Sequence, residues 1–403
     1  MITNEIKTPP HNEEAEHKLI ACCLLDGDYS VYDTVSVIVT PDDFYTLKGI
    51  FSVMEAAETP LQAQYCAKLI AEKSRLRSII RGCRLAVEQA ESESAESQSI
   101  RACLENDILK IDTLSNDTFS VEDSAEEILD DIQRMQDGTF NPDVVKTNLR
   151  DLDGYLGNNG IAAGEVLTLA APTSCGKSAL ALYIATKALR QDDIPTAYFS
   201  FEMPRKQLMK RMIQTISGIN VMNIQDGVAS PQQEERFKVV TKECAELPLY
   251  TSHSVRNADD LTSQVRHLVR KKGVKLVVID YLQLIPFDSK KMGKCEGIAD
   301  ISHKIKQMAL DLNISVILLA QVNREGAKSE RIRLYDLKDS GDIENDADVV
   351  LLMYPSRGDF ESSKGHDSHG PYTELTYNVA KNREGQRDVG GFFKFYHCIG
   401  RFA

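Results

Sequence analysis

The pattern of apolar and polar residues divides the chain into two parts. In the second part, short apolar runs alternate with amphipathic helices, and the runs occupy residues 165–170, 196–201, 247–250, 276–279, 314–320 and 349–353. Nearly continuous apolar strands separated by helices are typical of a parallel sheet that is covered on both faces. Two further strands, at 372–380 and 390–396, enclose a polar turn. The pattern therefore predicts an α/β domain with a mostly parallel sheet, and we expect it to span residues 146–403.

The first part of the chain has a helical pattern. Residues 13–25 begin with acidic side chains and continue with apolar ones, as expected at the start of a helix. Residues 50–54 and 69–90 supply further helical stretches, so we expect a small all-α domain over residues 1–105. The acidic, serine-rich run at 91–99 cannot bury a core, and it is interpreted as a loop or a solvated helix face.

A linker with one amphipathic helix is expected over residues 106–145. Ser124 and Glu127 have the spacing of a capping box, and Gly138 ends the helix. An apolar stripe at i, i+4 and i+7 consists of Ile128, Ile132 and Met135. That stripe must be covered either by its own domain or by a neighbouring subunit.

Composition restricts the possible functions. The 403 residues are enough for about two domains, and 42% of them are hydrophobic, which is ordinary for a globular protein. A net charge of -13 argues against a surface that coats nucleic acid, so any such contact must be confined to basic loops. The nine cysteines include no C-x-x-C pair, which fits a reducing compartment without disulfides or zinc. Without a signal peptide or a membrane-length apolar run, we expect a soluble, cytoplasmic protein.

A phosphate-binding loop follows the apolar run at 165–170. It consists of Ala171, Pro172, Thr173, Ser174, Cys175, Gly176, Lys177 and Ser178. A loop between a strand and a helix turns backbone N–H groups toward the β-phosphate, and the helix N-terminus adds partial positive charge. Lys177 is expected to reach the β- and γ-phosphates of ATP, and the Ser178 hydroxyl to bind Mg²⁺. Ala171 stands where the usual motif has its first glycine. The alternative is a strand, a polar turn and a helix that contain Gly-Lys-Ser by chance.

Polar residues follow three other predicted strands, at the sheet edge where α/β proteins bind ligands. Glu202 follows the strand at 196–201 and is a candidate for orienting and deprotonating the attacking water; alternatively, it is an ordinary helix-capping acid. Asp280 ends an apolar strand, as does the aspartate that holds Mg²⁺ through water in nucleotide sites. Gln321 ends another strand, where an uncharged amide can contact the γ-phosphate.

Two basic residues in the last polar turn are candidates for neutralising charge in the transition state. Lys381 and Arg383 are far in sequence from the phosphate-binding loop. A guanidinium that stabilises phosphoryl transfer is often supplied by another subunit. The alternative interpretation is a solvated basic turn.

These motifs, in this order, resemble those of the DnaB-type replicative DNA helicases. The most specific are Ile-Asp-Tyr-Leu-Gln at 279–283, Ser-Gly-x-Ile-Glu-x-Asp-Ala-Asp at 340–348 and Lys-Asn-Arg-x-Gly at 381–385. The resemblance implies a RecA-like P-loop motor domain in a hexameric ring that unwinds DNA, with 5′-to-3′ polarity. It further implies that Glu202 is the catalytic base and that Lys381 and Arg383 act across the subunit boundary.

The resemblance also implies partners. Residues 10–16 and 42–45 are similar to the start of the family's helical collar, which contacts primase and helicase loader, whereas the stretch after Thr59 departs from the family. A bacterial cell, or a phage or other mobile element within one, is the setting it implies. Single-stranded DNA would be gripped by loops at 287–294 and 324–331, whose basic residues are Lys290, Lys291, Lys294, Arg324, Lys328 and Arg331. Such loops suit contact with the phosphate backbone, independent of base sequence.

Two other classes of protein share parts of this pattern. A RecA-like strand-exchange filament would have the same core and phosphate loop, but the helical first domain and the turn at 381–385 favour a helicase. A non-catalytic ring component or a helicase-mimicking inhibitor should lack Lys177, Glu202, Asp280 or Arg383, and all four are present.

Overall fold

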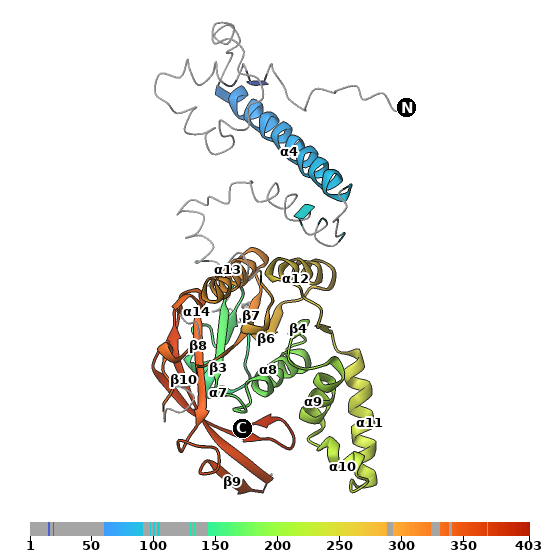
Figure 1. Ribbon diagram of the computed structural model, residues 1–403, viewed down its shortest axis with the longest axis vertical. Helices are drawn as coiled ribbons and strands as arrows, with labels where there is room; N and C mark the ends of the chain where they lie inside the picture. Colours follow the sequence, from blue (N-terminus) through green and yellow to red (C-terminus); the bar gives the residue numbers. More distant parts are fainter. Residues whose placement is uncertain are drawn as a thin grey trace. The chain divides into compact units, whose positions relative to one another are not determined.

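The computed structural model divides the chain into two compact units, Met1–Phe140 and Asn141–Ala403 (Figure 1). It describes residues 60–91 and 144–403, except 288–292, 324–330, 338–340 and 369. Before residue 144 it also describes Ala15, Glu16, Leu19, Ser97, Ile100, Cys103, Leu104, Leu129 and Gln133. The domain boundaries given above stay predictions, and so does the apolar stripe, since Ile128, Ile132 and Met135 lie outside the described residues.

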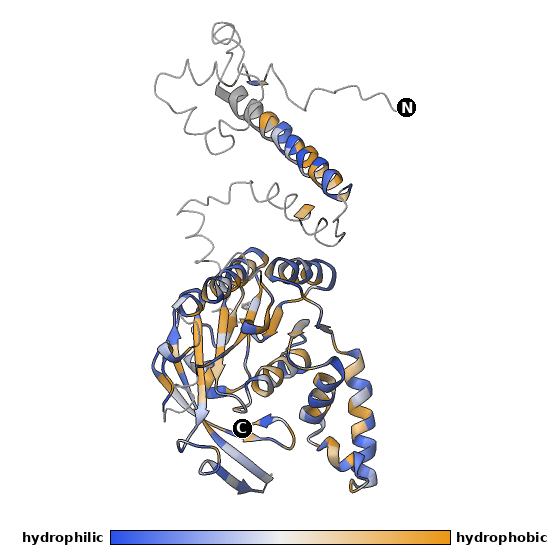
Figure 2. Ribbon diagram, in the orientation of Figure 1, coloured by the Kyte–Doolittle hydropathy of each residue, from blue (hydrophilic) through white to orange (hydrophobic). Residues whose placement is uncertain are grey.

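The first unit contains one long helix, α4 (Pro60–Ala90), which begins nine residues before the helix expected from the sequence at 69–90. Polar and apolar residues are interspersed along it (Figure 2), and several large apolar side chains, among them Leu85 and Val87, are exposed. The other helical stretches expected in this unit lie mostly outside the described residues.

The second unit is built on a ten-stranded sheet whose centre is parallel. Six parallel strands lie in the spatial order β8 (Val349–Pro355), β3 (Val166–Ala171), β7 (Ser315–Gln321), β6 (Leu276–Asp280), β4 (Thr196–Ser200) and β5 (Leu249–Ser252). Every apolar run predicted to be a strand is one, with its ends shifted by no more than three residues. The predicted α/β fold is confirmed.

Helices cover both faces of the sheet (Figure 1). Alternate residues of one strand enter different apolar clusters, because successive side chains of a strand point to opposite faces. Leu167 and Leu169 pack with α8 (Lys177–Gln191) and α9 (Arg205–Ser217). On the other face, Val277 and Ile279 pack with α12 (Ala258–Lys272) and α13 (Lys294–Leu312). Elsewhere in the described part of this unit lie the helices α7 (Arg150–Tyr155), α10 (Val221–Gln225), α11 (Pro231–Glu246) and α14 (Gly341–Asp346), with 3-10 turns η3 (Leu282–Leu284) and η5 (Leu334–Asp336).

An antiparallel extension continues the sheet beyond β8. The long strand β10 (Gly370–Asn382) pairs with β8, with β11 (Val389–Tyr396) and with the short β9 (Lys364–Asp367). The chain ends in β12 (Arg401–Phe402), which pairs with β11. A separate antiparallel pair joins β1 (Val144–Val145) to β2 (Ile161–Ala162). The last residues of the chain thereby return to the phosphate loop, because β12 contacts α8.

Candidate nucleotide-binding site

The phosphate loop connects β3 to α8. Gly176, the residue before α8, has a φ of 78°, a left-handed conformation that glycine adopts without strain. A Cβ at this position would lie 2.8 Å from the Phe395 ring, so space also requires glycine. Ala171, in contrast, is the last residue of β3 and is fully buried. A strand residue accommodates a Cβ, which explains why this loop can begin with alanine.

The Lys177 side chain folds back along the loop. Its Nζ donates hydrogen bonds to the carbonyl oxygens of Ala171, at 2.9 Å, and Pro172, at 3.4 Å. Burial lowers the pKa of this ammonium, while the nearby Cys175, Asp280 and Glu202 act in the opposite direction. The lysine is therefore a partly buried cation held at the mouth of the loop by two neutral carbonyl acceptors, a position suited to an incoming phosphate.

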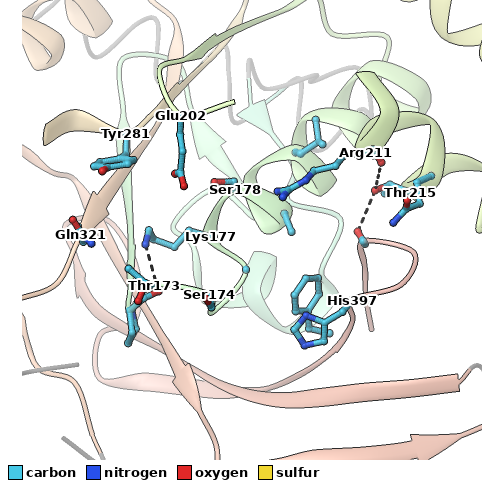
Figure 3. A pocket seen from close by; sticks show the side chains of 17 residues that line it. Thr173, Ser174, Lys177, Ser178, Glu202, Arg211, Thr215, Tyr281, Gln321 and His397 are labelled. Atoms are coloured by element: carbon cyan, nitrogen blue, oxygen red, sulfur yellow. Dashed lines mark hydrogen bonds between the residues drawn. The ribbon is translucent and has the colours of Figure 1, made fainter. Parts of the chain in front are cut away.

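A pocket of about 440 Å³ opens over the loop and collects side chains from several strand ends (Figure 3). Lys177 and Ser178 line it, together with Glu202 from the segment after β4 and Gln321 from the end of β7. The strand register explains this assembly, since Ala171 pairs with Gln321 across β3 and β7. Glu202 is exposed and lines the pocket beside Lys177 and Ser178.

Asp280 lies at the end of β6 and is fully buried. Its Oδ2 accepts a hydrogen bond from the Tyr198 hydroxyl at 3.0 Å, whereas its Oδ1 has no hydrogen-bond partner among the described residues. Burial raises the pKa of this carboxyl, and the hydroxyls of Ser178 and Tyr198 act in the opposite direction. A buried carboxylate oxygen without a donor is costly unless a cation or a donor completes it.

Gln321 is held in place by a neighbouring amide. Its backbone N–H donates to Oε1 of Gln283 at 3.2 Å, so the end of β7 is tied to η3, which follows Asp280. This bond joins the end of the glutamine strand to the segment that follows the aspartate strand, beside the pocket.

Several pocket residues were not found by sequence reasoning. Arg211, Gln214 and Thr215 come from α9, and Phe395, His397 and Gly400 come from the end of the chain (Figure 3). Hydrogen bonds join the two groups: Thr215 Oγ1 donates to the Gly400 carbonyl at 3.2 Å, and Gln214 Nε2 donates to the Cys398 carbonyl at 2.7 Å. Arg211 is one of four basic residues in α9, so no local pattern distinguishes it.

Lys381 and Arg383 lie away from this pocket within the same chain. Arg383 Nη1 contacts Asp348 Oδ1 at 3.0 Å, and Asp348 directly precedes β8. The phosphate loop follows the carboxyl end of β3, which runs parallel to β8. The side chains of both basic residues therefore end beside the start of β8, at the end of the sheet opposite to the phosphate loop.

The predicted DNA-binding residues fall mostly outside the described residues: Lys290, Lys291, Arg324 and Lys328 do so. Lys294 is the first residue of α13 and is exposed, and Arg331 is exposed just before η5. The segments that contain them follow β6 and β7, the strands that carry Asp280 and Gln321. No helix in the described part of the chain is long and apolar enough to cross a membrane.

Comparison with known proteins agrees with this geometry. The model of the DnaB-like helicase C terminal domain matches residues 144–402, and that of the DnaB-like helicase N terminal domain matches residues 8–69. The replicative DNA helicase DnaC of Bacillus subtilis (strain 168) is 25% identical over 425 residues, covering 94% of this chain and 91% of the relative. The replicative DNA helicase DnaB of Geobacillus stearothermophilus is 26% identical over 429 residues, covering 94% and 91%.

A solved structure has the same fold. It is a DnaB-like replicative helicase, described with its interactions with primase, and it aligns with a TM-score of 0.74 at 20% identity, covering 97% of this chain and 99% of that one. Because the C-terminal family model alone matches more than half of the sequence, the chain belongs to the DnaB-like helicase family.

Proposed function

We propose that this protein is the ATP-driven helicase of a replication fork, which moves along single-stranded DNA as a ring of six identical subunits and unwinds the duplex ahead of it. Family membership makes it a nucleotide-binding helicase of DNA replication. The observation that supports the mechanism is the pocket that brings Lys177, Ser178, Glu202 and Gln321 together over the phosphate loop. We further propose 5′-to-3′ movement, as the resemblance implies.

Hydrolysis would use these residues in distinct roles. Lys177 would exchange its two carbonyl acceptors for the β- and γ-phosphates, and the loop N–H groups would surround the β-phosphate. Glu202 would orient and deprotonate the attacking water. Gln321, fixed through Gln283, would contact the γ-phosphate and change its contacts when that phosphate leaves.

Mg²⁺ fits the residues beside the loop. The unpartnered Oδ1 of Asp280 and the hydroxyl of Ser178 offer the hard oxygen ligands that this ion takes, with water and phosphate oxygens completing its shell. When bound, the ion would neutralise developing charge on the phosphates. Asp280 and Ser178 would hold it, the aspartate through water.

Lys381 and Arg383 would complete a neighbouring subunit's site. Each chain's own pocket contains one lysine at the loop, and the last polar turn is at the opposite end of the sheet. In a head-to-tail ring, one end of the sheet in each subunit faces the opposite end of the sheet in the next subunit. The two cations would then reach the γ-phosphate held by the next subunit and stabilise its transfer.

DNA and protein partners follow from the same assignment. The loops with Lys290, Lys291, Lys294, Arg324, Lys328 and Arg331 would line the channel and contact phosphates of single-stranded DNA. The helical first domain would contact primase and a helicase loader. We place the protein in the cytoplasm of a bacterial cell, encoded by its chromosome or by a phage or other mobile element.

Electron microscopy of the purified protein tests the proposal. Samples contain Mg²⁺ and a non-hydrolysable ATP analogue, with and without single-stranded DNA, and ATPase and strand-displacement activities are measured in parallel. We expect six-membered rings, and DNA unwinding that Lys177→Ala abolishes. Continuous filaments without unwinding would instead indicate a strand-exchange type of protein.

A further inference from the structure

The structure assigns a positioning role to Asp348: we infer that this buried carboxylate holds Arg383 in the orientation that serves the neighbouring subunit. The inference rests on the proposed function of Arg383. Asp348 is 5% exposed and accepts a hydrogen bond from Arg383 Nη1 through Oδ1, at 3.0 Å. Its backbone carbonyl also accepts from the Arg383 backbone N–H, at 3.1 Å. One residue therefore fixes both the main chain and the side chain of the arginine.

Asp348 is itself anchored on its other side. Its Oδ2 accepts from the Val166 backbone N–H at 2.8 Å and from Lys306 Nζ at 2.7 Å. Val166 is the first residue of β3, and Lys306 lies in α13. Both carboxylate oxygens are therefore used, and the side chain has no freedom to turn away from Arg383. Such immobilised partners are what keep a reacting group within a few tenths of an ångström of its working position.

Arg383 remains partly available for a second partner. Its Nη2 donates to the Asn345 carbonyl at 2.8 Å, so the guanidinium is held at two points. A guanidinium has five N–H donors, and its side chain here is 47% exposed, so donors remain for an anion from outside the chain. The Arg383 guanidinium therefore uses some of its N–H groups to bind Asp348 and Asn345, and it exposes the others to solvent. Such an arrangement is suited to binding a phosphate of a neighbouring molecule.

The same few carbonyls hold Lys381. Its Nζ donates to the Glu344 carbonyl at 2.5 Å and the Asn345 carbonyl at 3.3 Å, in the last turn of α14. Cations are favoured beside the unpaired carbonyls of a helix C-terminus. α14 packs beside α13, which carries Lys306 (Figure 1). The carbonyls of α14 and the carboxylate of Asp348 therefore hold both cations of the last turn.

The test measures ATP turnover by Asp348→Asn and by mixtures of variants. Asparagine keeps the shape of aspartate but removes the charge that holds the guanidinium. We expect kcat to fall by about tenfold or more, the loss typical when the support of an active group is removed, with little change in KM. Asp367→Asn is the matched control. It removes a carboxylate that pairs with Lys394, at 3.0 Å, and that has no part in holding Arg383, so turnover should stay within about twofold of wild type.

Mixing shows on which subunit Asp348 acts. Asp348→Asn subunits keep Glu202, and Glu202→Gln subunits keep a supported Arg383. At a boundary where a Glu202→Gln subunit supplies Arg383 to the site of an Asp348→Asn subunit, every required group is intact. ATP turnover of the mixture should therefore rise above that of either variant alone. A mixture of Asp348→Asn with Arg383→Ala should stay low, because every boundary then has a defective arginine. Subunit exchange is followed by fluorescence in all mixtures.

A parallel mixture of Arg383→Ala with Glu202→Gln distinguishes failure of the proposed role of Arg383 from failure of the inference about Asp348. If it does not recover although subunits exchange, Arg383 does not act in trans, and the proposed function of this turn fails together with the inference. If it recovers and the Asp348→Asn mixture does not, Asp348 serves its own subunit and the inference alone fails. Unchanged turnover by Asp348→Asn also overturns it.

A double variant serves as the control in case Asp348→Asn alone does not fold. Asp348→Asn leaves the Lys306 ammonium, 13% exposed, without its carboxylate, which can destabilise the fold. Lys306→Met combined with Asp348→Asn removes both charges, and replacing a buried pair by neutral groups is often tolerated. If the single variant unfolds, the double variant is used in every mixture. The expected results, and those that overturn the inference, are the same.

Discussion

At the scale of single residues, the site depends on groups whose surroundings change their chemistry. Lys177 is partly buried and Asp280 fully buried beside the loop, and burial disfavours the charged form of each. A phosphate bound at Lys177 or a cation bound at Asp280 would stabilise the charge that burial disfavours. Neither side chain contributes much to the packing of the core.

We therefore expect Lys177→Ala and Asp280→Asn to abolish ATP turnover without unfolding the protein. Removing one electrostatic interaction with the phosphates or with the metal costs on the order of 10² or more in rate. Turnover is measured in parallel with circular dichroism. A folded variant of either kind with normal turnover would contradict the site assignment.

We expect the Cys175 thiol to be unreactive, although it lies inside the phosphate loop. It is fully buried, and desolvation raises the pKa of the thiol to about 12, with Lys177 acting in the opposite direction. The thiolate is the reactive form, so alkylation at pH 8 should be far slower at Cys175 than at the exposed Cys398. Mass spectrometry of iodoacetamide-treated protein compares the two sites. Equal labelling would mean that the loop opens readily in solution.

At the scale of elements, the sequence predicts the strands of the parallel centre and misses the shortest strands at the periphery. The central strands are apolar along their whole length because both faces are covered. In contrast, β9 reads Lys-Gly-His-Asp and exists because β10 offers it a hydrogen-bonding edge. β12 has only two residues. Pairing with a distant strand, and not a local pattern, determines such elements.

The same reasoning explains which site residues could be predicted. Lys177, Glu202, Asp280 and Gln321 belong to motifs at strand ends, so the order of the strands brings them together. Arg211 and His397 reach the pocket only because α9 and the segment after β11 close over the loop. His397 Nε2 lies 2.8 Å from Thr373 Oγ1 in β10, an interaction that no spacing in the sequence reveals.

Loops that follow β6 are expected to contact DNA through charge. We predict that changing Lys290, Lys291 and Lys294 to Glu weakens binding of single-stranded DNA and lowers its dependence on salt, by about 0.7 in the logarithmic slope for each phosphate that the protein no longer neutralises. ATPase activity without DNA should be largely unchanged. Binding isotherms at several salt concentrations measure the slope. An unchanged slope would place the DNA-binding surface elsewhere, with Arg324, Lys328 and Arg331 as the next candidates.

At the scale of the whole molecule, the chain consists of two compact units. Unit Asn141–Ala403 has apolar clusters on both faces of its sheet and contains every described residue of the nucleotide pocket. The phosphate loop lies at one end of its sheet, and Arg383 contacts Asp348 at the other. If Arg383 serves the neighbouring subunit as proposed, full ATP turnover requires assembly of the ring.

Removing residues 1–140 therefore tests what the first unit contributes to assembly. If the stripe of Ile128, Ile132 and Met135 covers a surface of the neighbouring subunit, its loss should raise the protein concentration needed for ring formation by about tenfold, which corresponds to roughly 1.4 kcal/mol per subunit boundary. Mass photometry over a dilution series measures this concentration.

Changing the three stripe residues to Ser in the full chain is the matched variant, because it keeps the rest of the first unit and should produce a similar shift. If the truncated protein assembles at the same concentration as the full chain, the first unit does not stabilise the ring, and the stripe packs within its own chain. ATP turnover should follow assembly in either case if, as proposed, Arg383 of the next subunit completes each pocket.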